Sequence, residues 1–278
     1  MGLIYLEDVD EKLNNGKQNV ICDTNVWYRI GDGRYVPPSE VDLISTFQSF
    51  AELATTTNMI GLPLYQQVVQ AIYGHATATI SVSPFDYVLQ NQFEDYQGNS
   101  DKIKEIITGF TRILKMDMST LQPMDKEFLG EVERRCTEYR KPQQDFADMG
   151  NAELPRIQNN LKKKEARKAH LANWDREGLK NFIKFWFDTV AGISGYNIDW
   201  DVFDWTQIEL FMCVTESFFK KLETTVGMKI KTNDVPDWFN LMYTKPGKKY
   251  LSFDEKWTKR IYEDERVRHY LHADGIPQ

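Results

Sequence analysis

The sequence predicts an α/β fold: a three-layer domain with a short parallel sheet, interrupted by a large, mainly α-helical insertion. Three observations predict it. A short apolar run near residue 20 ends abruptly in polar side chains, as a buried strand does. Helical and strand-like patterns then alternate up to about residue 75. Helical spacing alone dominates from residue 84 to about residue 192, and a strand-like segment returns near the end of the chain.

The first 75 residues are expected to form a strand–loop–helix–strand–helix unit. The buried strand is followed by a loop over residues 28–38, which contains two glycines and two prolines. Ser39 suits a helix N-cap, and apolar residues recur at helical spacing over residues 41–54. The apolar run 59–64 would supply the parallel strand that such a unit needs, and a helix is expected over residues 65–73.

The middle of the chain is expected to be helical, with polar connections. Helices are expected over residues 101–115, over two stretches of 153–190 with a break near Gly178, and over residues 201–222, whereas residues 143–155 are expected to form a loop or a short helix. A glycine-containing junction follows at residues 192–197. We therefore predict a discontinuous α/β domain, residues 1–75 and 196–278, and a helical insertion, residues 76–195.

The composition is that of a soluble globular protein: 278 residues, 41% hydrophobic and 27% charged. The acidic start lacks the basic flank of a signal peptide, and no apolar run approaches the ~18 residues of a membrane span. We therefore expect a cytoplasmic protein with no membrane partner. The three cysteines lie far apart, which favours neither disulfides nor a thiolate zinc site. Because the net charge is −7, binding of nucleic acid would require a local basic patch.

Aspartates follow strand-like runs or begin a helix at three places. Asp23 comes directly after the first strand, and Asp254 follows an apolar run near residue 250. Asn233 or Asp234 suits an N-cap and a proline follows in the first turn, which places Asp237 near the positive end of a helix dipole. Ligands of open α/β sheets bind at the carboxyl ends of the strands, so these acids are candidates for one shared site.

Carboxylates gathered at one edge of a sheet suit a hard divalent cation. Mg²⁺ and Mn²⁺ prefer oxygen ligands, often one or two carboxylates with water completing the shell. A cation held in this way lowers the pKa of water and neutralises charge on a phosphodiester. Aspartate is also a common cap and turn residue. By spacing alone, a metal site and purely structural roles both stay open.

The three motifs resemble those of PIN-domain nucleases: the strand that ends in Asp23-Thr24-Asn25, the helix start at residues 233–237, and the strand end Ser252-Phe253-Asp254. Asp237 and Asp254 are 17 positions apart (254 − 237), which leaves room for a helix, a turn and a strand, as in that family. The resemblance covers roughly residues 15–75 and 200–262.

The resemblance implies an Mg²⁺- or Mn²⁺-dependent endoribonuclease that hydrolyses RNA phosphodiester bonds, in a bacterial toxin–antitoxin or antiviral phage-defence setting. It implies that Asp23, Asp237 and Asp254 are the catalytic, cation-binding acids, with Asp234 as a fourth candidate ligand. Supporting roles, such as hydrogen bonds to the carboxylates, would fall to Thr24, Asn25, Asn233 and Gln70.

One family position departs from the pattern. The family usually carries a glutamate on the helix after its second strand, whereas the helix expected at 65–73 has Gln67 and Gln70 and no acid. An amide can coordinate through its carbonyl oxygen but carries no charge. Three alternatives therefore stay open: weakened metal binding, replacement of the glutamate by Asp234, or a catalytically weak or inactive RNA-binding or assembly module.

A basic stretch in the predicted insertion is the candidate for RNA binding: Lys162, Lys163, Lys164, Arg167 and Lys168. Such residues contact phosphates or simply form a solvated helix face. RNA is the expected partner, and a protein partner or a homo-oligomer also stays open. The motifs of hydrolase nucleophile elbows, phosphate-binding loops and dinucleotide sites do not occur, so those function classes lack support.

Overall fold

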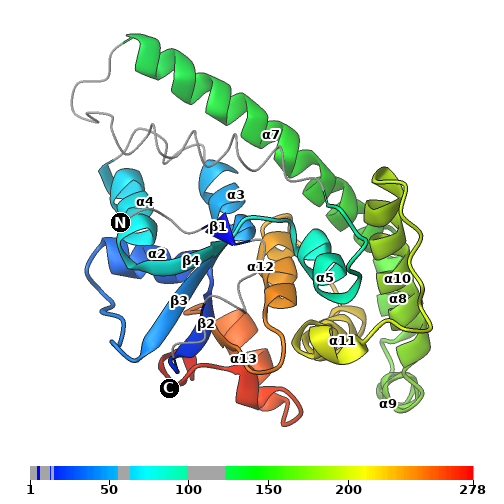
Figure 1. The fold of residues 1–278 in the computed structure, drawn as a ribbon. Helices are drawn as coiled ribbons and strands as arrows, with labels where there is room; N and C mark the ends of the chain where they lie inside the picture. The colour runs from blue at the N-terminus through cyan, green and yellow to red at the C-terminus, as the bar shows by residue number, and fades with distance from the viewer. Residues whose placement is uncertain (1–4, 7–12, 14–15, 56–62, 99–122, 278) are drawn as a thin grey trace.

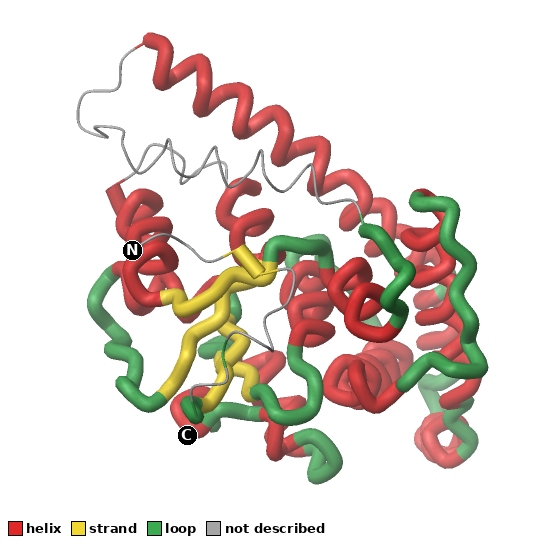
Figure 2. The backbone as a smooth tube through the Cα atoms, in the orientation of Figure 1, coloured by secondary structure: helices red, strands yellow, loops and turns green. Residues whose placement is uncertain are grey.

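The computed structural model describes residues 5–6, 13, 16–55, 63–98 and 123–277. Among these residues, five strands form one all-parallel sheet in the order β1-β4-β3-β2-β5. The strands are β1 (Tyr5–Leu6), β2 (Gln18–Cys22), β3 (Val41–Thr46), β4 (Ala76–Ile80) and β5 (Lys249–Leu251). The predicted α/β class is confirmed, and helices surround the sheet (Figure 2).

The interior strand β2, which lies between β3 and β5, is buried on both faces. Val20 and Cys22 pack into one apolar cluster, and Ile21 between them packs into the other. All three side chains are fully buried. Strands of a parallel sheet that helices cover on both faces carry continuous apolar runs, which is why this stretch of sequence is so conspicuous.

One face of the sheet is covered by α2 (Thr24–Gly31) and α4 (Pro63–His75), which pack closely together (Figure 1). Their approach is close at Gly31, where a Cβ atom would lie 3.1 Å from the backbone of Gln67 and Val68. A glycine is therefore what lets the end of α2 approach the backbone of α4.

The opposite face is covered mainly by α11 (Glu209–Thr224), α12 (Asp234–Asn240) and α13 (Glu255–Glu263). Trp238 and Trp257 are almost fully buried there, and both rings lie within 5.7 Å of the Phe218 ring. This aromatic packing holds α11, α12 and α13 together.

A further group of helices extends the molecule away from the sheet (Figure 1). They are α5 (Pro84–Gln92), α7 (Pro123–Ala152), α8 (Leu154–Asn160), α9 (Lys164–Ala172) and α10 (Arg176–Ile193). Phe146 of α7 contacts Trp238 of α12 at 5.5 Å between ring centroids, and Phe187 of α10 contacts Phe85 of α5 at 5.0 Å. One apolar cluster therefore runs from the sheet into these helices.

The prediction of one helix over residues 41–54 is wrong. Residues Val41–Thr46 form β3, and α3 (Phe47–Thr55) begins directly after it. All six residues of β3 are buried, including Asp42, whose carboxylate accepts a hydrogen bond from Thr77 Oγ1 at 3.0 Å. In a short, fully buried segment the apolar residues show neither a clear helical nor a clear strand spacing. Here the segment forms a strand because it pairs with β2 and β4.

Several other boundaries differ. The predicted loop at 28–38 begins inside α2, the predicted loop or short helix at 143–155 belongs mostly to α7, and residues 153–190 form three helices rather than two. The predicted domain boundary after residue 75 falls immediately before β4, which is part of the sheet. The helix predicted over 101–115 and most of the strand predicted over 59–64 lie outside the described residues, while residues 63–64 begin α4.

Candidate metal centre

Asp23 is buried at the carboxyl end of β2, where it caps the N-terminus of α2. Its Oδ1 atom accepts a hydrogen bond from the Thr24 amide at 2.7 Å. Its Oδ2 atom accepts hydrogen bonds from Asn25 Nδ2 at 2.5 Å and Ser252 Oγ at 2.7 Å. Asn25 also accepts the Phe253 amide at 2.9 Å, so the ends of β2 and β5 share one network. Asn25 therefore has the supporting position expected for it.

Glu52 lies on α3, which follows β3 without a loop. Thr46 at the end of β3 accepts a hydrogen bond from the Ser49 amide at 3.2 Å, which is the bond of a helix N-cap. Thr24 Oγ1 donates to Glu52 Oε2 at 2.5 Å. Thr24 thus supports Glu52 through its side chain and Asp23 through its backbone.

Asp237 lies in the first turn of α12. Its Oδ2 atom accepts a hydrogen bond from the indole Nε1 of Trp257 at 3.1 Å. Thr46 Oγ1 donates to Asn240 Oδ1 at 2.8 Å, which joins the end of β3 to the end of α12. The helix that carries Asp237 is therefore held against both the sheet and α13.

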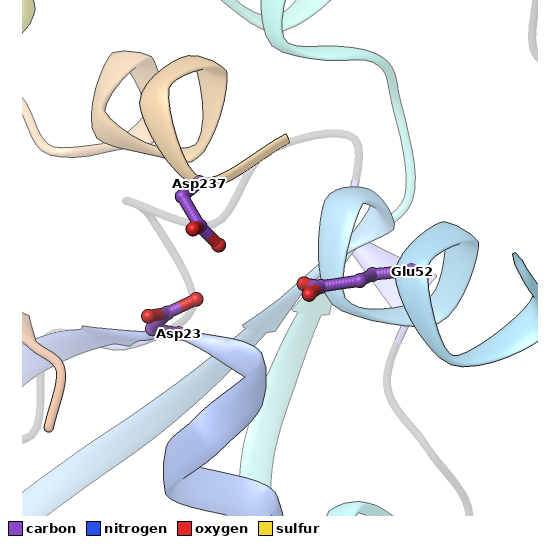
Figure 3. A group of neighbouring side chains, drawn as sticks. All are labelled: Asp23, Glu52 and Asp237. Carbon is purple, nitrogen blue, oxygen red and sulfur yellow. The ribbon is translucent and has the colours of Figure 1, made fainter. Parts of the chain in front are cut away.

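The three carboxylates point toward one another (Figure 3). One oxygen from each of Asp23, Glu52 and Asp237 lies within 4.8 Å of the other two. Asp23 is buried, and Glu52 and Asp237 are partly exposed. The carboxylates come from three different elements, β2, α3 and α12, which meet only in the folded chain.

The pKa values of two of these acids are raised. Burial raises the pKa of Asp23 to about 6, the charge of Asp254 adds to this, and the hydrogen bonds from Ser252, Thr24 and Asn25 oppose it. Burial raises the pKa of Asp237 well above its ordinary value, and the charges of Asp23 and Glu52 raise it further. Burial and neighbouring carboxylates, without a compensating charge, thus make Asp23 and Asp237 harder to ionise.

A divalent cation fits this group of residues. Among the described residues, no lysine or arginine forms an ion pair with Asp23 or Asp237. Three oxygen donors at this spacing are the ligand type that hard divalent cations take, and a cation would offset the mutual repulsion of the acids. The donor set does not distinguish Mg²⁺ from Mn²⁺.

Asp254 lies beside the group rather than in it. It caps the N-terminus of α13, and its Oδ1 atom accepts the Lys256 amide at 2.7 Å. Its charge nevertheless raises the pKa of both Asp23 and Asp237, which places it within electrostatic range. Of the three predicted catalytic aspartates, Asp23 and Asp237 share the site, and Asp254 is adjacent to it.

Asp234 has a different role from the one predicted. Its Oδ1 atom forms an ion pair with Lys256 Nζ at 2.5 Å, and its Oδ2 atom accepts the Lys231 amide at 3.0 Å. Both oxygens are thus engaged within the protein. Asn233 is exposed at the start of α12 and makes no side-chain capping hydrogen bond.

Gln70 does not lie with Asp23 and Asp237, where the family glutamate was expected. It is exposed on α4, a helix that covers the sheet next to α2. The acid expected on the helix after the second strand is present elsewhere, as Glu52 on α3. The assignment of residues 41–54 to a single helix hid it, because the second strand was then sought near residue 60. The signal was available: the polar Ser45-Thr46 break before Phe47 would have divided strand from helix.

The predicted RNA-binding lysines and arginine lie far from these acids. Lys162, Lys163, Lys164, Arg167 and Lys168 are all exposed, at the start of α9 or just before it. In Figure 1, α9 lies at the opposite end of the molecule from α2 and α3. This basic stretch cannot contact the same nucleotide as the acidic group.

Comparisons with protein-family models, with curated proteins and with solved structures found no match for this chain. Within the part of the chain that the structure describes, every helix is too short or too polar to cross a bilayer.

Proposed function

We propose that this chain is a metal-dependent ribonuclease of the PIN-like kind, with Asp23, Glu52 and Asp237 as the ligands of a divalent cation. The convergence of these three carboxylates at the carboxyl edge of a parallel sheet is the observation that carries the proposal. It supplies the glutamate that the resemblance lacked in the sequence. The main support for a catalytically inactive RNA-binding module, a missing acid near Gln70, is thereby removed.

The protein's own residues would orient the three carboxylates, which give the site its negative charge. Ser252, Asn25 and the Thr24 amide hold the Asp23 carboxylate, Thr24 Oγ1 holds Glu52, and Trp257 holds Asp237. When bound, a divalent cation supplies Lewis acidity and a more acidic water for attack on a phosphodiester. Ion pairing of the anionic strand with basic side chains would have to come from outside this group, since the three carboxylates repel phosphate.

The test is cleavage of a mixed-sequence single-stranded RNA by the full chain with Mn²⁺ or Mg²⁺. We expect cleavage that EDTA abolishes and that Glu52→Gln, Asp23→Asn or Asp237→Asn lowers by at least about 100-fold, since each removes a cation ligand. Gln70→Ala, an exposed change away from the acids, is the matched control and should cleave like the unaltered protein. Failure of the unaltered protein to cleave with either metal, or full cleavage by Glu52→Gln, would overturn the proposal.

A further inference from the structure

Two cavities adjoin one another between α9 and α11, and together we call them the α9–α11 surface. The first, of about 270 Å³, is lined by aromatic side chains and by two acids, Asp175 and Glu223. The second, of about 380 Å³, is lined mainly by polar and charged residues of α11 and by Arg266. Neighbouring residues point into different cavities: His170 and Phe219 line the first, and Leu171 and Lys220 line the second. The two openings are therefore side by side.

The first cavity has the chemistry of a site for a flat, polar ring. Its walls include the rings of Trp174, Phe182 and Phe219. The Trp174 Nε1 donor is buried and has no hydrogen-bond partner among the described residues. His170 Nε2 and Glu223 Oε2 are hydrogen-bonded at 2.7 Å. The His170 side chain is 33% exposed and that of Glu223 is 15% exposed. The cavity thus offers aromatic faces and carboxylate acceptors.

A nucleobase matches that combination. Every base has a π-face for stacking on aromatic side chains, and its edge carries both donors and acceptors. The cavity volume is near the lower end of the ~300–1,000 Å³ range of small-ligand sites, which suits one base rather than a larger ligand.

The second cavity has the chemistry of a phosphate site. Lys220, Lys221 and Arg266 line it, together with a single acid, Glu216. Glu216 pairs with Lys220 at 2.5 Å and with Arg266 at 3.1 Å, and Arg266 also pairs with Asp264. Lys221 is exposed and forms no ion pair with any described residue. Three cations around one lining carboxylate leave a net positive opening beside the aromatic cavity.

The basic residues of α9 continue this surface. Arg167 and His170 are three positions apart on one side of α9, and His170 lines the aromatic cavity, while Lys163 is the N-cap residue of the helix. These residues offer further phosphate contacts. A strand that passes along α9 would have its backbone near cations and one base near Trp174.

We propose that the α9–α11 surface binds an unpaired nucleotide of single-stranded RNA, with the base in the aromatic cavity and the neighbouring phosphate at Lys220, Lys221 and Arg266. The inference rests on the proposed function for its ligand class. The surface is remote from the acidic group, so it holds the strand and takes no part in cleavage (Figure 1). It gives the basic stretch of the helical part a specific role.

The test is fluorescence anisotropy of a labelled, mixed-sequence single-stranded RNA with the full chain in EDTA, where cleavage is absent. We expect Trp174→Ala to weaken binding about tenfold through lost stacking. Lys221→Ala should weaken binding and reduce the slope of log affinity against log salt by about 0.7, the value for one phosphate of a single strand. Phe185→Ala, an exposed aromatic on α10 outside the cavity, and Lys259→Ala on α13 are the matched controls and should bind normally.

Normal binding by both Trp174→Ala and Lys221→Ala would overturn the proposal that the α9–α11 surface binds RNA. The proposal that the acidic group cleaves RNA would be unaffected. Equal losses in the two control variants would also overturn RNA binding at the α9–α11 surface, since binding would then be spread over the whole protein. Because Trp174→Ala alters packing, Trp174→Phe provides a second measurement: it keeps a ring, removes the N–H donor, and should weaken binding by less than the alanine variant. If RNA binding depends on Trp174 but the protein never cleaves RNA, the result supports RNA binding at the α9–α11 surface and contradicts only the proposed nuclease activity.

Discussion

Glu52 contributes the third carboxylate of the proposed metal centre because β3 ends at Thr46 and α3 begins directly after it. Its Oε2 atom is held by Thr24 Oγ1 at 2.5 Å, and it lies opposite Asp23 and Asp237. A cation that bridges the three would be bound only by the folded chain. It would therefore stabilise the fold by mass action, by about 2.7 kcal/mol at a metal concentration one hundred times Kd.

Glu52→Gln should remove most of that stabilisation. The amide keeps the shape and can still accept from Thr24, but it lacks the charge that the cation needs. We expect Mn²⁺ to raise the Tm of the unaltered protein and to raise that of the variant far less, as measured by thermal unfolding with and without metal. Glu153→Gln, at an exposed glutamate that pairs with Arg156, is the matched control and should respond like the unaltered protein.

Asp23 contributes to the pH dependence of stability without metal, together with Asp237. The pKa of Asp23 is raised by burial to about 6 in the folded chain, against 3.8 ordinarily. Between these values the folded chain keeps a proton that the unfolded chain releases, so the free energy of unfolding falls as pH rises from about 4 to about 6. A shift of this size corresponds to a contribution on the order of 3 kcal/mol, present below pH 4 and lost above pH 6.

Asp23→Asn should make that fall smaller, because asparagine does not ionise and Asp237 is then the remaining acid of the pair with a raised pKa. Urea unfolding in EDTA at a series of pH values between 4 and 7 measures it. Asp201→Asn, at an exposed aspartate, should leave the slope unchanged. A slope that is unchanged in Asp23→Asn would show that its origin lies elsewhere in the molecule.

At the scale of elements, the centre depends on how α12 is held against the sheet. Thr46 Oγ1 donates to Asn240 at 2.8 Å, and both residues are buried. Thr46→Val keeps the volume and removes the donor, which leaves the Asn240 oxygen without this partner. We expect the free energy of unfolding to fall by ~1–3 kcal/mol, measured by urea titration, and the affinity for Mn²⁺ to fall with it. Thr189→Val, on the exposed side of α10, should change stability by less than ~0.5 kcal/mol.

The same elements show what sequence patterns could and could not predict. Strand β2 and its terminal Asp23 were predictable, because a fully buried parallel strand is a continuous apolar run with an abrupt polar end. Asp237 was predictable from the cap and proline of α12. Glu52 was missed because β3 and α3 join without a loop. The apolar residues of the six-residue strand therefore seemed to continue the helical spacing of α3. Asp254 was placed at the right strand end, but only the fold shows that it caps α13 beside the site.

At the scale of the whole molecule, the sheet and the outer helices share one core. Phe187 on α10 is fully buried against Phe85 and Phe203, and the same apolar cluster includes Ile21 and Ile44 of the sheet. A separate insertion with its own core would unfold by itself. A shared core predicts a single cooperative transition instead.

We expect urea unfolding followed by tryptophan fluorescence and by far-UV circular dichroism to give coincident curves. Phe187→Ala should move both curves to lower urea concentration together, because loss of a buried aromatic side chain lowers the free energy of unfolding by ~3–5 kcal/mol. Phe185→Ala, its exposed neighbour, should shift neither appreciably. Two separate transitions, only one of them moved by Phe187→Ala, would show that the helical part folds independently.

The most direct measurement is a crystal structure of the protein grown with Mn²⁺, with anomalous differences collected at the manganese edge. The convergence of Asp23, Glu52 and Asp237 predicts an anomalous peak between the three carboxylates, with oxygens from them in the first coordination shell. The peak should be absent from crystals of Glu52→Gln prepared in the same way. Manganese bound at Asp254 and Asp234 without Glu52, or three carboxylates that stay empty at saturating Mn²⁺, would contradict the shared metal centre.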